Sequence, residues 1–425
     1  MAQPKLDRRH FLRLGAAATA GLTTAVAFTP ENARASSKAD KKVITRKLGN
    51  TGIELPVVSM GVMRADNPNI LKAAYQMGIK HFDTAHGYQG GRNEEMVGEF
   101  FKDKPRDSFI VSTKIHPDRG GISTEKFMEM LDISLKRLKM DHVDILYLHA
   151  ANDKDYTLDP RYLAALKKAK AEGKAKHLGV TTHTNMAEVI NAAVDSKIYE
   201  VVLTSYNFRL AKDEKLHKAL KRANEAGLGV IGMKNMAGGF LDKEKQKPVN
   251  CKAALKWALS NPDVHTCIPG FTTYEMLMEN WSVASDIKLD AKEMSDLQLA
   301  SNEVGLYCHG CESCSGQCPQ NLPIPDLMRS YMYNYGYSYP AKAYETVAAL
   351  SLPENPCANC DECTVTCPNG LNVANGWPIL PVSGIFRENS WYNHKSINLQ
   401  LSGNDSVIIP GIFNAKLFNS CQRNH

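Results

Sequence analysis

No stripe of basic residues runs through this chain of 425 residues, which argues against a nucleic-acid partner. The net charge is +6, and the first 35 residues contribute half of it. Hydrophobic residues make up 43% and charged residues 23%, the balance of a soluble globular protein with a sizeable core. The apolar stretch at residues 14–28 is too short, and too rich in Ala, Gly and Thr, to span a bilayer.

Cysteine is scarce outside one short segment. Of the eleven cysteines, only three lie outside residues 308–367. Eight thiols in so short a stretch favour a metal site over a disulfide framework.

Residues 1–35 have the pattern of an export signal. A basic segment precedes the apolar stretch, and Ala33-Arg34-Ala35 matches a cleavage pattern that would leave Ser36 as the first mature residue. The run Arg8-Arg9-His10-Phe11-Leu12-Arg13 resembles the twin-arginine signal. The resemblance implies recognition by the Tat export machinery and a periplasmic or otherwise exported protein that folds before transport. A chance basic amphipathic helix is the alternative.

After a linker at residues 36–43, short apolar runs alternate with amphipathic stretches as far as about residue 300. The runs lie at 57–61, 81–84, 109–113, 143–149, 177–181, 201–206, 229–233 and 266–269, and the stretches include 124–140, 161–172, 212–226 and 249–260. Eight buried strands, each followed by a helix, predict an α/β fold, a (β/α)8 TIM barrel over residues 44–300. An open doubly wound sheet is the rival fold, but no Gly-rich dinucleotide turn follows the first strand.

Four ionisable residues lie at or just after the ends of three successive predicted strands, where barrel enzymes carry their chemistry: Asp83, Tyr88, Lys114 and His149. Carbonyl reduction by hydride needs an acid that protonates the developing alkoxide. A nearby ammonium would make the phenol of Tyr88 a better acid, and a carboxylate would hold that ammonium in place. A neutral imidazole would orient the carbonyl oxygen. Alternatively, Asp83 and Lys114 form a structural ion pair and His149 is a core histidine.

The segment Asp83-Thr84-Ala85-x-x-Tyr88, with Glu94 and Gly98, resembles the signature of the aldo-keto reductases. Further matches are Ser134-Leu135-Lys136-Arg137-Leu138 with Asp141 and Asp144, Gly173-Lys174 with Gly179-Val180, and Ile268-Pro269-Gly270 with Glu279-Asn280. The resemblance covers about residues 44–290. It implies NAD(P)H as the hydride source, small carbonyl or sugar-like substrates, and a catalytic tetrad of Asp83, Tyr88, Lys114 and His149.

The same resemblance implies cofactor contacts at the strand ends and in the eighth unit: Gly61, Met63, Thr181, Thr182, Met233, Lys234, Pro269, Gly270, Phe271, Thr272, Glu279 and Asn280. Several positions depart from the usual family pattern. Thr181-Thr182 replaces Ser-Asn, Leu203 replaces a Gln that holds the nicotinamide amide, and Met233 replaces a stacking Tyr. Gly270 and Met276 stand where many members carry cations for the 2′-phosphate, so NADP and NAD both remain open. Lys234 is a candidate replacement cation.

The eight clustered cysteines form two runs with one spacing, Cys308-x2-Cys311-x2-Cys314-x3-Cys318-Pro319 and Cys357-x2-Cys360-x2-Cys363-x3-Cys367-Pro368. This doubled spacing is specific for two-cluster 4Fe-4S ferredoxin ligation, in which the fourth cysteine of each run serves the other cluster. The expected ligand sets are Cys308, Cys311 and Cys314 with Cys367, and Cys357, Cys360 and Cys363 with Cys318. A zinc site of four cysteines is the alternative.

We therefore expect a small, mainly helical ferredoxin-like domain with two 4Fe-4S clusters at residues 301–370, and we leave residues 371–425 unassigned. Between the runs, five tyrosines alternate with other residues, and we expect them to pack against the barrel rather than form a docking surface: Tyr331, Tyr333, Tyr335, Tyr337 and Tyr339. The whole chain resembles a subset of aldo-keto reductases that carry such a module.

Three interpretations of the two halves remain open. The barrel reduces carbonyls while the clusters relay electrons to or from a redox partner protein, or the clusters are structural. In the third, the protein is an electron-transfer or assembly protein whose barrel binds nucleotide without turnover. Nicotinamide gives two electrons as hydride and a cluster takes one, and no flavin motif bridges that mismatch.

Overall fold

The computed structural model describes residues 42–117, 121–242, 246–301, 307–308, 314–337, 339–350, 352, 356–357, 360, 363–367 and 370–373. The expected export signal, Cys311 and the tail from residue 374 lie outside the described residues. In the described part of the chain, no helix has both the length and the apolar character that a membrane span requires.

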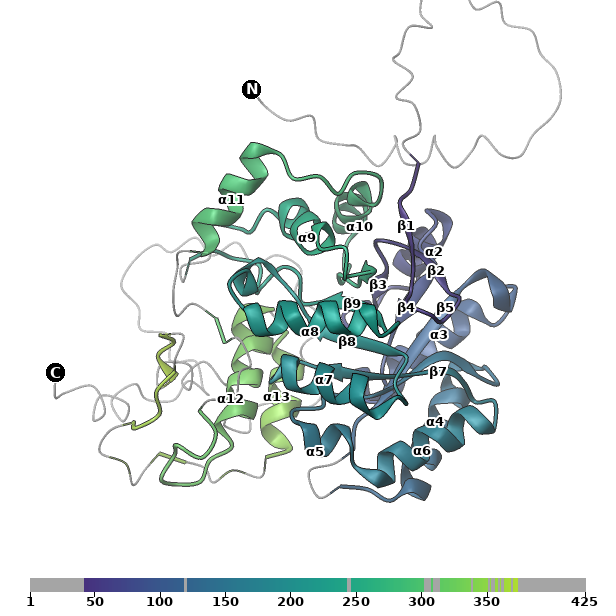
Figure 1. Ribbon diagram of the computed structural model, residues 1–425, viewed down its shortest axis with the longest axis horizontal. Helices are drawn as coiled ribbons and strands as arrows, with labels where there is room; N and C mark the ends of the chain where they lie inside the picture. Colours follow the sequence, from purple (N-terminus) through teal and green to yellow (C-terminus); the bar gives the residue numbers. More distant parts are fainter. Residues whose placement is uncertain are drawn as a thin grey trace, which may run out of the picture. The chain divides into compact units, whose positions relative to one another are not determined.

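Eight parallel strands form the predicted barrel (Figure 1): β3 (Met60–Gly61), β4 (His81–Asp83), β5 (Ile110–Ile115), β6 (Val143–Leu148), β7 (Ala175–Thr182), β8 (Val201–Ser205), β9 (Gly229–Met233) and β10 (Thr266–Cys267). Each strand pairs with the next one along the chain. Parallel bridges from Val58 to Cys267 and from Gly61 to Gly270 bring the first and last strands together. The α/β barrel prediction is confirmed, because every predicted apolar run overlaps one of these strands, although β5 and β7 extend beyond their predicted runs.

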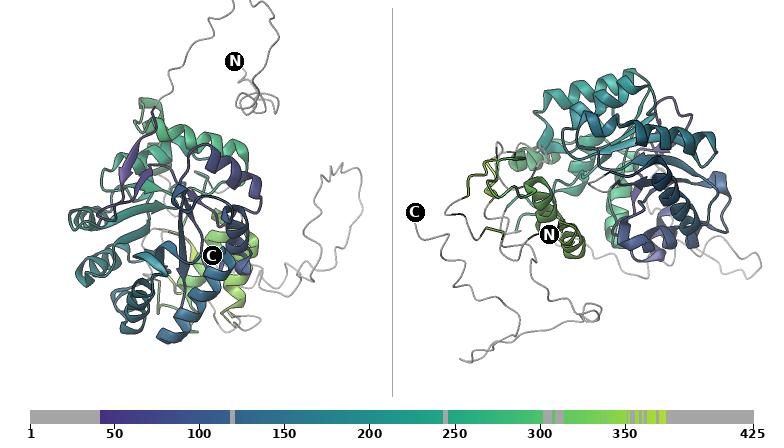
Figure 2. Two further views of the ribbon diagram at one scale, coloured as in Figure 1. Left: turned by 90° about the vertical axis from the view of Figure 1, so that its right-hand side faces the viewer. Right: turned by 90° about the horizontal axis from the view of Figure 1, so that it is seen from below.

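Helices surround the strands (Figure 2): α2 (Pro68–Gln76), α3 (Arg92–Phe101), α4 (Thr124–Leu138), α5 (Lys154–Thr157), α6 (Pro160–Ala171), α7 (Met186–Ser196), α8 (Glu214–Glu225), α9 (Cys251–Ser260), α10 (Tyr274–Trp281) and α11 (Ala291–Ser301). Capping residues explain where several begin. The side chains of Ser123, Asp213 and Asn250 accept backbone N–H groups at the starts of α4, α8 and α9. For α8 and α9, each cap shifts the first helical residue inward from the predicted start.

Large apolar side chains fill the inside of the barrel, and an antiparallel hairpin closes one end of it. Tyr147, Leu203 and Ile231 belong to one buried cluster together with Leu48 and Leu55. Those two leucines come from the hairpin of β1 (Thr45–Lys47) and β2 (Glu54–Pro56), which the strand pattern did not predict. Leu48 packs at Gly229, where β9 begins, so the hairpin covers the end opposite the candidate site.

Beyond the barrel, the C-terminal module contains α12 (Ile324–Tyr331), a π-helical turn (Met332–Gly336) and α13 (Pro340–Ala348). The two helices lie side by side (Figure 1), and the Ser330 hydroxyl donates to the carbonyl of Ala343. The module has its own apolar core, which includes Leu327, Val347 and Val365. The helical character expected between the cysteine runs is therefore present.

Candidate functional site

A buried ion pair joins the ends of two neighbouring strands, β4 and β5. Lys114 Nζ lies 2.5 Å from Asp83 Oδ1, and the Ser112 hydroxyl donates to Asp83 Oδ2 at 2.6 Å. The Lys114 and Asp83 side chains are 2% and 3% exposed. Burial lowers the pKa of Lys114, and the adjacent Asp83 carboxylate opposes that shift. The register of the sheet, which pairs Asp83 with Ser112, brings these groups together.

Tyr88 and His149 complete the predicted tetrad at the same end of the barrel. Tyr88 begins a 3₁₀ turn (Tyr88–Gly91) after β4, and Lys114 Nζ lies 5.0 Å from its ring centroid. The ring centroids of Tyr88 and His149 are 6.0 Å apart. The structure therefore places all four predicted residues around one point, although they come from separate parts of the chain.

Burial holds the His149 imidazole in its neutral form. Desolvation, followed by the charge of Lys114 and nearby histidines, lowers the pKa of His149 well below 6.5. A neutral imidazole can donate a hydrogen bond to a carbonyl oxygen without carrying charge itself, as the sequence suggested.

The protonation behaviour of Tyr88 differs from the expectation. Burial raises the pKa of Tyr88 well above its ordinary value, and the Asp83 charge and two tyrosines, Tyr333 and Tyr339, add to the shift. Lys114 is paired with the Asp83 carboxylate at 2.5 Å, and burial of the phenol outweighs the ammonium charge. The phenol therefore stays protonated at neutral pH and keeps its proton for a more basic acceptor.

The module contributes side chains to the mouth of the barrel. Tyr333 and Tyr339 lie close enough to Tyr88 to affect its pKa, and Lys342 does the same for His149. Arg64, in the loop after β3, lies 6.0 Å from the Tyr339 ring centroid. Of the five alternating tyrosines, Tyr333, Tyr337 and Tyr339 face the barrel, whereas Tyr331 and Tyr335 stack on each other in the module's own core. No signal in the sequence indicated this division.

The expected cofactor contacts nearest the tetrad lie at the ends of β3 and β7. Gly61 is bridged to Gly270, and the carbonyl of Met63 accepts from the Gln89 side chain. Thr181 and Thr182 are buried, and their hydroxyls are engaged within the barrel, since Thr181 accepts the Ala150 N–H and Thr182 donates to the Thr184 carbonyl.

The remaining contacts follow β10 into α10. Pro269, Gly270, Phe271 and Thr272 connect the two elements, and Glu279 and Asn280 lie in the last turn of the helix. The Phe271 side chain is fully buried, so only its backbone can face a ligand. The buried Asn280 Oδ1 has no hydrogen-bond partner in the described part of the chain, and it therefore fits a donor group supplied by a bound dinucleotide.

Two further expected contacts lie at the end of β9, beside the module rather than beside α10. Met233 is buried, and Lys234 follows it in a left-handed conformation with φ of 58°. Lys234 Nζ lies 4.2 Å from the Tyr337 ring centroid and 5.2 Å from that of Tyr333. Burial, and then the charges of Arg329, Arg64 and Lys114, lower the pKa of Lys234 to about 7.

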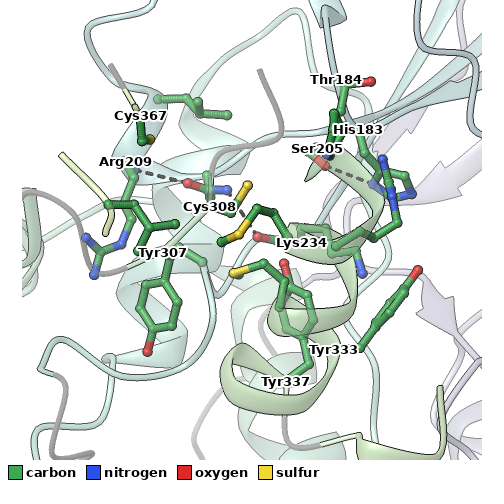
Figure 3. Close-up of a pocket in the computed structure, with 18 of the residues that line it drawn as sticks. His183, Thr184, Ser205, Arg209, Lys234, Tyr307, Cys308, Tyr333, Tyr337 and Cys367 are labelled. Carbon is green, nitrogen blue, oxygen red and sulfur yellow. Dashed lines mark hydrogen bonds between the residues drawn. The ribbon is translucent and has the colours of Figure 1, made fainter. Parts of the chain in front are cut away.

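A cavity separates this lysine from three cysteines of the module (Figure 3). Cys308, Cys314 and Cys367 line it from the module, and His183, Ser205, Arg209 and Lys234 line it from the barrel. The three thiols belong to one expected ligand set, whose fourth member is Cys311. Three cysteines around a mostly apolar cavity that also carries Arg209, Lys234 and Arg329 suit an anionic iron–sulfur cluster.

The two cysteine runs also lie next to each other. Gln317 Oε1 accepts the Thr366 N–H at 2.7 Å, and the Thr364 hydroxyl donates to the Gln317 carbonyl. These hydrogen bonds hold the segment before Cys367 beside the first run. The described cysteines are all free thiols. Among the residues that the structure describes, no three His, Cys, Asp or Glu side chains gather as ligands of one metal ion.

Comparison with known proteins agrees with this arrangement. Residues 58–253 match the Aldo/keto reductase family, and residues 307–373 match the 4Fe-4S dicluster domain. L-galactose dehydrogenase of Arabidopsis thaliana is 27% identical over 303 residues, covering 60% of this chain and 94% of the relative. L-glyceraldehyde 3-phosphate reductase of Escherichia coli K12 is 24% identical over 332 residues, covering 62% and 94%.

Among solved structures, the holo form of an aldo-keto reductase from Bacillus halodurans superposes with a TM-score of 0.51 at 21% identity. It covers 61% of this chain and 96% of its own, which supports the barrel fold. The chain thus joins a domain that matches the Aldo/keto reductase family to one that matches the 4Fe-4S dicluster domain, and it is an oxidoreductase enzyme.

Proposed function

We propose that the protein interconverts a small carbonyl compound and its alcohol, with NADP or NAD as the hydride carrier and Tyr88 as the general acid. One observation carries the proposal: the buried Asp83–Lys114 pair, the Tyr88 phenol and the neutral His149 imidazole converge at the mouth of the barrel. Relatives named L-galactose dehydrogenase and D-threo-aldose 1-dehydrogenase support a sugar-like substrate.

Each tetrad residue has a distinct role in this proposal. The Tyr88 hydroxyl keeps its proton because burial raises its pKa, and it donates that proton to the alkoxide oxygen as charge develops there. The His149 imidazole, held neutral, donates a hydrogen bond to the same oxygen. Asp83 fixes the Lys114 ammonium beside the Tyr88 ring, where its positive charge favours the phenolate that remains after Tyr88 has given up its proton.

The nicotinamide cofactor would supply or accept the hydride. Gly61, Met63, Thr181, Thr182 and Met233 would line its reactive end, beside the tetrad. Residues 269–272 with Glu279 and Asn280 would hold the adenosine end. The buried, unpartnered Asn280 Oδ1 supports this assignment. Tyr333 and Tyr339 of the module would exclude water from the site.

We also propose that the module binds two 4Fe-4S clusters through the eight cysteines, which would carry single electrons to or from a redox partner protein. The cavity lined by Cys308, Cys314 and Cys367 supports the first ligand set. Iron and acid-labile sulfide should each amount to about eight per chain in protein purified anaerobically. Zinc in place of iron would contradict this assignment.

The N-terminal twin-arginine pattern supports export by the Tat machinery, with the clusters inserted before transport. The basic pair Arg8-Arg9, the apolar stretch and the Ala33-Arg34-Ala35 site occur in the order that such a signal requires. We propose a periplasmic or otherwise exported location on this ground.

Tyr88→Phe tests the function directly. The substitution removes only the hydroxyl, so the ring contacts with Lys114 and His149 remain. We expect carbonyl-dependent NAD(P)H oxidation, screened with small aldehydes and sugars, to fall by about 10²- to 10⁴-fold. Tyr75→Phe is the matched control, because the Tyr75 hydroxyl bonds Ser108 away from the mouth, and it should keep full activity.

Two results would count against the proposal. Equal rates in Tyr88→Phe and the wild type would remove Tyr88 from the acid role. Binding of NAD(P)H without turnover of any carbonyl compound would favour an electron-transfer or assembly protein instead.

A further inference from the structure

We propose that the cluster whose ligands include Cys308, Cys314 and Cys367 is the one adjoining the barrel, and that Lys234 sets its reduction potential. The proposal rests on the assignment of the cysteines to two clusters, and it is independent of the carbonyl chemistry. It gives the two clusters unequal roles, which their identical cysteine spacing does not reveal.

The cavity beside Lys234 has walls from both halves of the chain. Cys308, Cys314 and Cys367 line it from the module, while Lys234 and His183 line it from strand ends of the barrel (Figure 3). A cluster bound to these thiols would therefore face the end of β9. The cysteines of the second set do not line this cavity: Cys318, Cys357, Cys360 and Cys363.

Lys234 connects the barrel with the C-terminal module. Its backbone directly follows β9, at the same end of the barrel as the tetrad, and its ammonium lies against the Tyr337 and Tyr333 rings of the module. Tyr337 and Cys308 line the same cavity as Lys234. Lys234 therefore lies on the wall that joins the end of β9 to the expected cluster ligands.

The charge of Lys234 lacks a carboxylate partner in the structure. No ion pair of Lys234 occurs among the described residues, and its neighbours Arg329 and Arg64 are cations. Arg329 also lines the cavity. Gathering cations in a half-buried site is unfavourable, and burial with these neighbours lowers the pKa of Lys234 to about 7; an adjacent anion would oppose that shift and keep the ammonium charged. A cluster bound to four thiolates carries the negative charge that these residues lack.

A cation at this position has a defined electrostatic effect. Reduction adds one negative charge to a cluster, so a nearby positive charge stabilises the reduced form more than the oxidised form. Removing the charge of Lys234 should therefore lower the midpoint potential of the adjoining cluster. The second cluster, whose cysteines lie outside the cavity wall, should keep its potential.

Potentiometric titration of the full-length holoprotein, monitored by electron paramagnetic resonance, tests the proposal. Lys234→Met removes the charge and keeps the length of the side chain, and Lys234→Arg restores the charge. Lys218→Met is the matched control, since Lys218 is 80% exposed on α8. Cys314→Ser and Cys363→Ser, one from each ligand set, identify which signal belongs to which cluster.

We expect Lys234→Met to lower the potential of one signal, the one that Cys314→Ser alters, while Lys234→Arg and Lys218→Met leave both signals near wild type. Unchanged potentials in Lys234→Met, or a shift only of the signal that Cys363→Ser alters, would overturn the proposal. If the serine variants lose both clusters, the signals cannot be assigned individually. A shift in the midpoint potential of only one signal in Lys234→Met then still supports the proposal, and equal shifts of both signals oppose it. The titration contains neither nicotinamide nor carbonyl, so a failed activity test leaves its outcome intact.

Discussion

Asp83→Asn probes the buried ion pair on which the candidate site is built. The substitution keeps the shape of the side chain but removes the charge that faces Lys114 Nζ at 2.5 Å. Asparagine also brings an NH₂ group, which must face either the Lys114 ammonium or the Ser112 hydroxyl that now donates to Asp83. The Lys114 charge would then be buried without compensation.

The size of the effect follows from this burial. Because both side chains are almost fully buried, water screens the pair little, and removing one partner of such a pair costs about 3–5 kcal/mol. At about 2–4 °C per kcal/mol, the melting temperature should fall by roughly 6–20 °C. Thermal unfolding followed by far-ultraviolet circular dichroism measures this, with Asp141→Asn, at an exposed carboxylate, as the matched control.

The pH dependence of the stability of Asp83→Asn gives a second measure of the uncompensated Lys114 charge. Burial lowers the pKa of Lys114 and Asp83 opposes it, so without Asp83 the folded-state pKa falls further below the ordinary 10.5. Between these two pKa values the unfolded chain binds a proton that the folded variant does not. Stability of Asp83→Asn should therefore rise with pH across that window, more steeply than in the wild type.

The double variant Asp83→Asn with Lys114→Met provides the decisive control. Removing both charges leaves no buried ion, so much of the lost stability should return while activity stays low. The reasoning fails if Asp83→Asn melts like Asp141→Asn, or if the double variant is as unstable as Asp83→Asn alone.

Two further predictions concern the barrel interior and the export signal. Gly179→Ala places a Cβ 2.4 Å from the Tyr147 ring, so overpacking should lower the free energy of unfolding, measured with denaturant, by about 1–3 kcal/mol. Gly87→Ala is the control, because a Cβ there meets open space and should change that free energy by no more than about 0.5 kcal/mol. Equal effects of the two substitutions would contradict the packing argument. Replacing Arg8 and Arg9 by lysine should retain the protein in the cytoplasm in cell fractionation, whereas an unchanged distribution would argue against the Tat route.

The sequence was sufficient for the barrel because its signals are local. Buried parallel strands appear as short apolar runs, and a barrel brings the carboxyl ends of successive strands to one mouth. For this reason Asp83, Tyr88, Lys114 and His149 could be placed together before their contacts were known. The hairpin before β3 was missed because its strands are three residues long and mostly polar.

Properties that depend on how the C-terminal module packs on the barrel could not be predicted from the sequence. The Tyr88 pKa is raised by burial and by the nearby Asp83, Tyr333 and Tyr339, and this combination has no local pattern in the sequence. Lys234 was considered only as a cofactor contact, yet its ammonium lies against the module. The alternating tyrosines were a real signal of packing, but alternation does not specify which surface is contacted.

Side chains of the module lie near the tetrad: Tyr333, Tyr339 and Lys342. Their position affects how substrate selectivity can evolve. In a barrel enzyme, loops that emerge from the strands usually shape the substrate pocket. Here α12–α13 and the turn between them, a segment with its own apolar core, bring Tyr333, Tyr339 and Lys342 near the tetrad. If the proposed carbonyl chemistry holds, mutations in this segment can change substrate choice without disturbing the strands that carry Asp83 and Lys114.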